Sequence, residues 1–160
     1  MKPEDWFALC GVVYLAAVAI PLSIIDVREH RLPNRLVLPA LPIALAGQAT
    51  ACFMSADWPK LWLAMGAGGA AFILGLLANR YASLGMGDVK LMAVLSVALT
   101  WYSPVLPLVA LFLALAAATM VVLPKLLFRR LALAAQVPLG PYLLGGAFSS
   151  FASLWVVPLL

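Results

Sequence analysis

The chain has 160 residues, of which 66% are hydrophobic and only 10% are charged, and its net charge is +4. Soluble domains keep about a quarter of their residues charged, so this composition excludes an ordinary water-soluble globular protein. A bilayer core of ~30 Å needs about 20 apolar residues per helix, which leaves room for about six spans and no separate soluble domain. We therefore predict one all-α polytopic transmembrane domain over residues 1–160.

Apolar runs separated by charged or Pro- and Gly-containing stretches predict six membrane spans. In chain order they cover residues 6–25, 35–54, 59–78, 88–102, 105–124 and 139–159. The first run has acids before it and basic residues after it, the reverse of a secretory signal, so we expect it to stay as a span. Between the last two runs, residues 125–136 are typical of a short amphipathic helix on the membrane surface.

Basic residues set the predicted orientation. Eight of the ten lie in or beside the loops after the first, third and fifth spans, namely Arg28, Arg31, Arg35, Arg80, Lys90, Lys125, Arg129 and Arg130. The positive-inside rule then puts these loops in the cytoplasm and both termini on the outer, periplasmic side. The tryptophans fall near the predicted outer boundary, as an interfacial aromatic belt requires. They are Trp6, Trp58, Trp62, Trp101 and Trp155.

Small residues and cysteines have structural interpretations. The third span contains many small residues, which let helices approach closely in lipid. They are Gly66, Gly68, Gly69, Ala70, Ala71 and Gly75. Cys10 and Cys52 form no CxxC pair, and with His30 as the sole histidine there is no zinc-binding pattern. We predict that both cysteines are buried small hydrophobic side chains, and we expect neither a metal nor an organic cofactor.

Two acidic residues border apolar helices. Asp26 directly follows the apolar end of the first span, and Asp88 directly precedes Val89 at the start of the fourth. Because these two spans run in opposite directions, both acids are expected at the cytoplasmic boundary, although they lie 62 positions apart (88 − 26). Acids at the edge of hydrocarbon are costly and often functional, although each could instead pair with a nearby basic residue.

A pair of carboxyl groups in one site can hydrolyse an amide. Held a few ångströms apart, they cannot both ionise easily, so one keeps a proton. The charged member activates a water molecule while the protonated one stabilises the oxyanion, without metal or cofactor. The fourth span, from Asp88 to Tyr102, has 15 residues, or about 22 Å of helix. We infer that Asp88 lies below the headgroups or that the membrane is locally thin.

Three short motifs resemble those of a known family. Residues 85–91 read GMGDVKL, which matches the GxGD signature of membrane aspartyl proteases and is similar to the GxGDxKL of prepilin peptidases. Residues 26–34 read DVREHRLPN, which resembles the first motif of that branch, an aspartate followed by Pro-Asn. Residues 138–142 read PLGPY, which is similar to its third motif. The presenilin-like PAL motif is absent.

On these motifs the chain resembles the type IV prepilin peptidases, in the minimal form associated with Flp (tight-adherence) pili. The resemblance implies an aspartic endopeptidase of the bacterial inner membrane, with Asp26 and Asp88 as its catalytic dyad. Its substrates would be type IV-like prepilins, cut on the cytoplasmic side at a glycine just before the hydrophobic helix. Larger members carry an N-terminal domain with CxxC pairs and also methylate the product. This chain has no CxxC pair, so methylation is not expected here.

Four further motif residues each have two interpretations. Gly85 and Gly87 either let backbone approach an extended substrate or form a plain turn between spans. Asn34, after a proline, either contacts substrate or starts the second span. Lys90 either pairs with Asp88 or contacts substrate. The sequence leaves these choices open.

The last motif and the choice of substrate also leave alternatives. Pro138, Gly140 and Pro141 either shape the site or only the start of the last span. Glu29 is the only other acid on the basic face, so charge does not explain how the leader is recognised there. We therefore expect the substrate's hydrophobic helix to supply most of the binding. A proton-coupled transporter using the two aspartates as a relay is disfavoured, because neither midplane acids nor matching discontinuous helices occur. A catalytically silent scaffold stays possible, no nucleic-acid partner is expected, and the oligomeric state is open.

Overall fold

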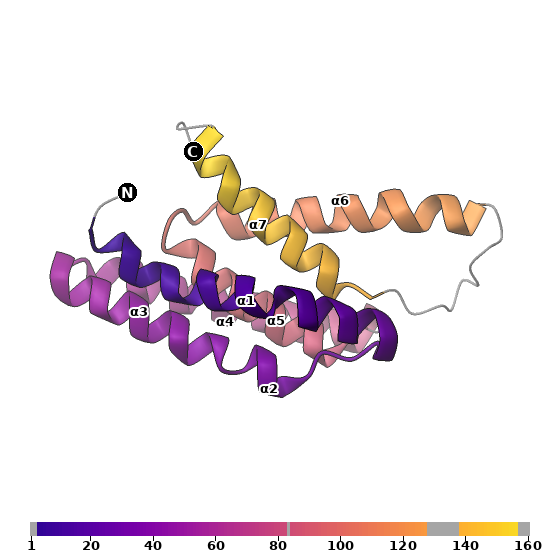
Figure 1. The fold of residues 1–160 in the computed structure, drawn as a ribbon, viewed down its shortest axis with the longest axis horizontal. Helices are drawn as coiled ribbons and strands as arrows, with labels where there is room; N and C mark the ends of the chain where they lie inside the picture. Colours follow the sequence, from indigo (N-terminus) through magenta and orange to yellow (C-terminus); the bar gives the residue numbers. More distant parts are fainter. Residues whose placement is uncertain (1–2, 83, 128–137, 157–160) are drawn as a thin grey trace.

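The computed structural model describes residues 3–82, 84–127 and 138–156, and their secondary structure is entirely helical, as predicted (Figure 1). The helices, in chain order, are α1 (Asp5–Glu29), α2 (Asn34–Val37), α3 (Ala40–Ser55), α4 (Trp58–Ala82), α5 (Met86–Thr100), α6 (Leu106–Leu127) and α7 (Gly140–Val156). Among the described residues, four segments are long and apolar enough to cross a bilayer: Asp5–Glu29, Asn34–Ser55, Trp58–Tyr81 and Leu106–Pro124. By length and composition the chain is a membrane protein.

The six predicted spans correspond to the helices with shifted ends. α1 continues to Glu29, so Asp26 lies inside its last turn rather than beyond it. The second span is divided between α2 and α3 at Pro39, because proline lacks the N–H that a continuous helix would need there. α5 and α7 have only 15 and 17 residues, so their crossing of the bilayer and the outward termini stay predictions.

The predicted surface helix over residues 125–136 is not separate at its start. Residues 125–127 belong to the end of α6, which continues through Pro124. A proline near a helix end is tolerated when neighbouring groups take up the freed carbonyl. The rest of that predicted helix lies outside the described residues.

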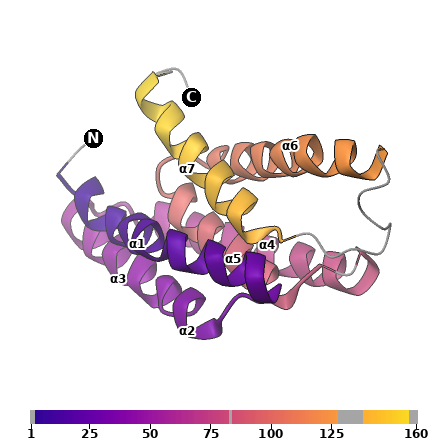
Figure 2. The same cartoon turned by 45° about the vertical axis from the view of Figure 1, so that its right-hand side comes forward.

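α5 lies at the centre of the bundle. Figures 1 and 2 show α1 and α3 running side by side, with α6 and α7 together on another face. α4 packs along α5, which contacts every other helix of the bundle. Nearly all side chains of α5 beyond its first turn are buried, including Ser96 and Thr100. The hydroxyl of Thr100 donates to the carbonyl of Ser96 at 2.7 Å, so this polar group is satisfied within the helix.

Large apolar side chains cover the outside of the bundle. Several of them are more than 60% exposed, namely Ile20, Phe53, Trp62, Ile73, Leu108, Phe112 and Met120. In water each would cost about 25 cal/mol per Å² of exposed apolar surface, whereas hydrocarbon imposes no such cost. Small residues instead allow close helix contacts: a Cβ on Gly11 of α1 would lie 2.5 Å from Cβ of Ala44 on α3. Such packing is typical of helices in lipid.

The small residues of α4 serve two different faces. A Cβ on Gly75 would lie 2.8 Å from Val89 Cγ1, and one on Gly68 would lie 3.2 Å from the carbonyl oxygen of Ala93, so these glycines let α4 approach α5. The predicted packing role is therefore confirmed for both. It is wrong for Gly66 and Gly69 within the described residues, because a Cβ added to either would meet no atom of a neighbouring helix within 4 Å.

Two predictions about single side chains are wrong in part. Cys52 is buried, but Cys10 is exposed because it lies on the face of α1 opposite the buried Ala8 and Val12; both thiols are free. Trp101 is also buried, and its indole N–H donates to the Asp5 carboxylate at 3.2 Å. This tryptophan therefore ties α5 to the start of α1 and does not belong to an interfacial belt. Its burial reflects the central place of α5.

Candidate active site

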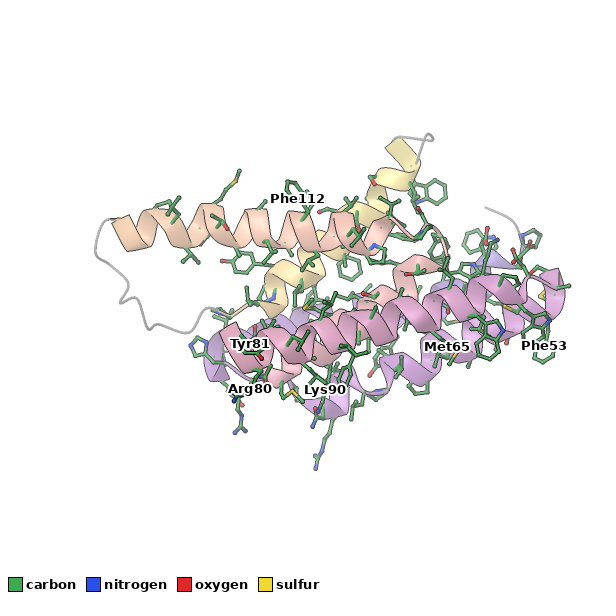
Figure 3. The ribbon with its side chains drawn as sticks, turned by 180° about the vertical axis from the view of Figure 1, so that it is seen from behind. Phe53, Met65, Arg80, Tyr81, Lys90 and Phe112 are labelled. Carbon is green, nitrogen blue, oxygen red and sulfur yellow. The ribbon has the colours of Figure 1, made fainter. Side chains whose placement is uncertain are left out.

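A pocket of about 490 Å³ lies where α1 ends and α5 begins, and both Asp26 and Asp88 line it. The two acids are 4% and 9% exposed. The structure thus brings together two residues that are far apart in the sequence. Figure 3 shows Arg80 and Lys90 near this end of the bundle and Phe53 at the other end.

Asp26 is held by the beginning of α7. The backbone N–H of Gly140 donates to Asp26 Oδ2 at 2.9 Å. A Cβ at position 140 would lie 2.8 Å from the same oxygen, so only glycine allows this approach. The last motif, PLGPY, therefore orients the acid of the first motif. Pro138 precedes α7 and Pro141 is its second residue, where proline fits the first turn.

Asp88 lies in the first turn of α5, where the positive end of the helix dipole favours a negative charge. Gly85 precedes the helix in an extended conformation (φ −62°, ψ 136°), and a Cβ on it would lie 2.8 Å from Asp88 Oδ2. Asp88 Oδ1 is buried and has no hydrogen-bond partner among the described residues. Buried polar atoms of this kind are rare in folded proteins and point to a functional site.

Leu32 packs against residues of the other two motifs, a role that the sequence analysis did not predict. This side chain is 9% exposed. A Cβ on Gly87 would lie 2.6 Å from Leu32 Cβ, and one on Gly140 would lie 3.1 Å from Leu32 Cδ2. Leu32 therefore packs the turn after α1 against the starts of α5 and α7. It is the one large apolar residue in the polar run REHRLPN, a pattern that predicts a buried anchor in a loop.

Lys90 and Asn34 form a contact between the first two motifs. Lys90 Nζ donates to Asn34 Oδ1 at 2.9 Å. Asn34 is the first residue of α2, and Pro33 precedes it in an extended conformation, so the interpretation of Pro-Asn as a helix start is confirmed. The alternative that Lys90 forms an ion pair with Asp88 is wrong within the described part of the chain, because its nitrogen is directed to the amide.

The rim of the pocket carries charges of both signs. Glu29, His30, Arg31 and Lys90 all line it, together with the half-exposed apolar side chain of Met86. His30 has a left-handed backbone conformation (φ 50°), and its backbone N–H donates to the backbone carbonyl of Asp26 at 2.8 Å. This bond ends α1. Two buried carboxyl groups beneath a polar rim can provide both an acid and a base to a molecule bound there.

Comparison with known proteins adds one match. A family model described as the type IV leader peptidase family matches residues 13–124. The matched region contains both acids and the residues of the first two motifs, and it ends before the PLGPY run. No curated protein and no solved structure matches the chain.

Proposed function

Because this chain belongs to the type IV leader peptidase family, it is a membrane peptidase, and we propose that Asp26 and Asp88 are its catalytic dyad. We further propose that it removes the leader of type IV-like (Flp) prepilins at the cytoplasmic face of the bacterial inner membrane. The observation that carries the proposal is the burial of both carboxyl groups in the wall of one pocket. No metal or organic cofactor takes part in the proposed reaction.

The proposed hydrolysis uses one proton shared by the two acids. The charged carboxylate takes a proton from a water molecule, whose oxygen bonds to the carbonyl carbon of the scissile peptide. The protonated carboxyl group stabilises the negative carbonyl oxygen that forms. The C–N bond then breaks as its nitrogen accepts a proton, which releases the leader with a carboxylate and the mature chain with an amine.

The contacts around the two acids fit different tasks in this reaction. Gly140 fixes one oxygen of Asp26 by its N–H, so that acid has a defined orientation. Asp88 Oδ1 has no hydrogen-bond partner in the described ranges, and it can interact with the water or with the scissile carbonyl. The extended backbone at Gly85 lies beside Asp88 and provides a place for an extended peptide. A peptide must be extended before its amide can be attacked, so this loop is suited to present it.

The proposal is tested with purified protein in detergent and a prepilin substrate. Asp26→Asn and Asp88→Asn keep the side-chain shape but remove the proton chemistry, so each is expected to lower kcat by at least about a thousandfold. Asp57→Asn is a matched control, because Asp57 lies outside the pocket, where its Oδ2 forms an ion pair with Lys60 Nζ at 3.0 Å. Thermal unfolding checks that every variant is folded. Full processing by either pocket variant would contradict the dyad, whereas loss in all three would point to damage of the fold.

A further inference from the structure

A second cavity, of about 250 Å³, lies between α4, α5 and α6 and has almost wholly apolar walls. Its lining includes Ala70 and Leu74 of α4, Met92 and Leu99 of α5, and Leu108 of α6. Leu74 and Leu108 are 63% and 68% exposed, so the cavity is a groove that opens sideways from the bundle. We call it the lateral groove. α6 packs mainly against α7 and lies apart from α4, as Figures 1 and 2 show.

The lateral groove continues the face of α5 that carries Asp88. On this helix Asp88, Met92, Leu95 and Leu99 follow one another at spacings of four, three and four residues, which places them on one side. The last three line the groove. From Asp88 to Leu99 the helix rises by about 16 Å. The groove therefore begins about one helical turn beyond Asp88 and follows the same side of α5 toward the other end of the bundle.

α7 extends in the same way from the other acid, Asp26, to the lateral groove. Gly140 donates to Asp26, and Leu143, three residues later and on the same side of the helix, lines the lateral groove. Thus both helices that contact the dyad at their first turn form a wall of the groove one turn further on. An object lying in the groove would have one end about one helical turn from both acids.

The α4 wall of the groove is made of small side chains. Ala67, Ala70 and Ala71 line it, and Ala70 is exposed. These residues differ from Gly68 and Gly75, which contact α5 on another side of α4. A wall of alanines allows the backbone of a further helix to come close, which is how helices associate in lipid. This side of α4 has no such neighbour among the described residues.

We propose that the lateral groove seats the hydrophobic helix of the substrate, with the first turn of that helix beside Asp88. This inference rests on the proposed function and identifies where the enzyme holds its substrate. The occupant must be apolar to match the walls and helical because no other segment satisfies its backbone in hydrocarbon. A helix lying along α5 presents the peptide bond before its first turn to the dyad, and the leader then extends over the charged rim.

The first test fills the groove and compares two substrates. Ala70→Trp is expected to raise KM for a full prepilin at least tenfold, with kcat little changed, because the helix can no longer lie against α4. The loss should be at least tenfold smaller on a short soluble peptide that spans the cleavage site but lacks the helix. Gly69→Trp, the adjacent residue outside the groove, is the control and should match wild type. An unchanged KM for the full prepilin in Ala70→Trp would overturn the inference.

The second test locates the substrate directly and does not depend on turnover. A photoreactive side chain is placed at Leu108 in the groove or at Ile73, which is 61% exposed on α4 outside it, in protein that carries Asp26→Asn. Position 108 lies near the start of α6, which follows the far end of α5, so cross-links from 108, but not 73, to the prepilin helix about three turns beyond its start are expected. Cross-links from position 108 to lipid only, or equal cross-links to the prepilin helix from both positions, would overturn the inference. A wild-type enzyme that cuts neither substrate would instead refute the proposed function.

Discussion

The contact between Gly140 and Asp26 gives the sharpest prediction about a single atom. In Gly140→Ala the added Cβ would lie 2.8 Å from Asp26 Oδ2 and 3.1 Å from Leu32 Cδ2. Both neighbours are buried, at 4% and 9% exposure, so neither can move freely. The carboxylate must shift by several tenths of an ångström, which lengthens and misaligns its 2.9 Å bond from the backbone N–H.

The size of the effect follows from that hydrogen bond. A bond to a charged group contributes about 1.5–3 kcal/mol, and its loss lowers the rate by roughly tenfold to 150-fold when it orients a catalytic group. We expect this loss in kcat for prepilin cleavage by Gly140→Ala, with KM little changed because the groove and rim keep their side chains.

A matched control lies on the same helix. A Cβ added to Gly145 of α7 would meet no atoms within 4 Å, so Gly145→Ala should keep wild-type kcat. Both variants are assayed beside wild type, with thermal unfolding in detergent as a check of the fold. Wild-type kcat in Gly140→Ala would refute the reasoning, and so would an equal loss in Gly145→Ala.

Two further predictions concern the contacts of the loop after α1. Gly87→Ala would bring a Cβ within 2.6 Å of Leu32 Cβ, so this overpacking should destabilise the fold by about 1–3 kcal/mol and lower the unfolding temperature in detergent; an unchanged unfolding temperature would show that the loop yields. Lys90→Met and Asn34→Ala each remove the 2.9 Å bond between these residues, so the double variant should be no less stable than the worse single variant. Strictly additive losses would mean that the bond contributes nothing.

Much of the fold follows from hydropathy alone, since apolar runs and their polar breaks predict helices whatever their packing. The meeting of Asp26 and Asp88 in one pocket also follows, because antiparallel neighbours bring the end of one span to the start of another. The division of the second span at Pro39 could not be placed, because a proline inside an apolar run is compatible with either a kink or a break.

The finer contacts of the site depend on packing between helices that no local pattern encodes. The motif PLGPY indicates a helix start, but only the position of α7 against α1 directs the Gly140 N–H to Asp26. Leu32 and Trp101 owe their burial to the central place of α5. Cys10 is exposed although it borders α3, where a Cβ on Gly47 would lie 3.3 Å from the Cys10 Cβ. Each outcome is decided by which helix lies next to which.

The central claim is that the two carboxyl groups act as one unit, and kcat for prepilin cleavage in a double-mutant comparison tests it most directly. Asp26→Asn, Asp88→Asn and the double variant are measured beside wild type in the same preparation. Residues that act together lose nearly everything when either is changed, so we predict the same residual rate for all three variants. A single variant that keeps more than about a tenth of wild-type kcat, with further loss only in the double variant, would contradict a shared mechanism.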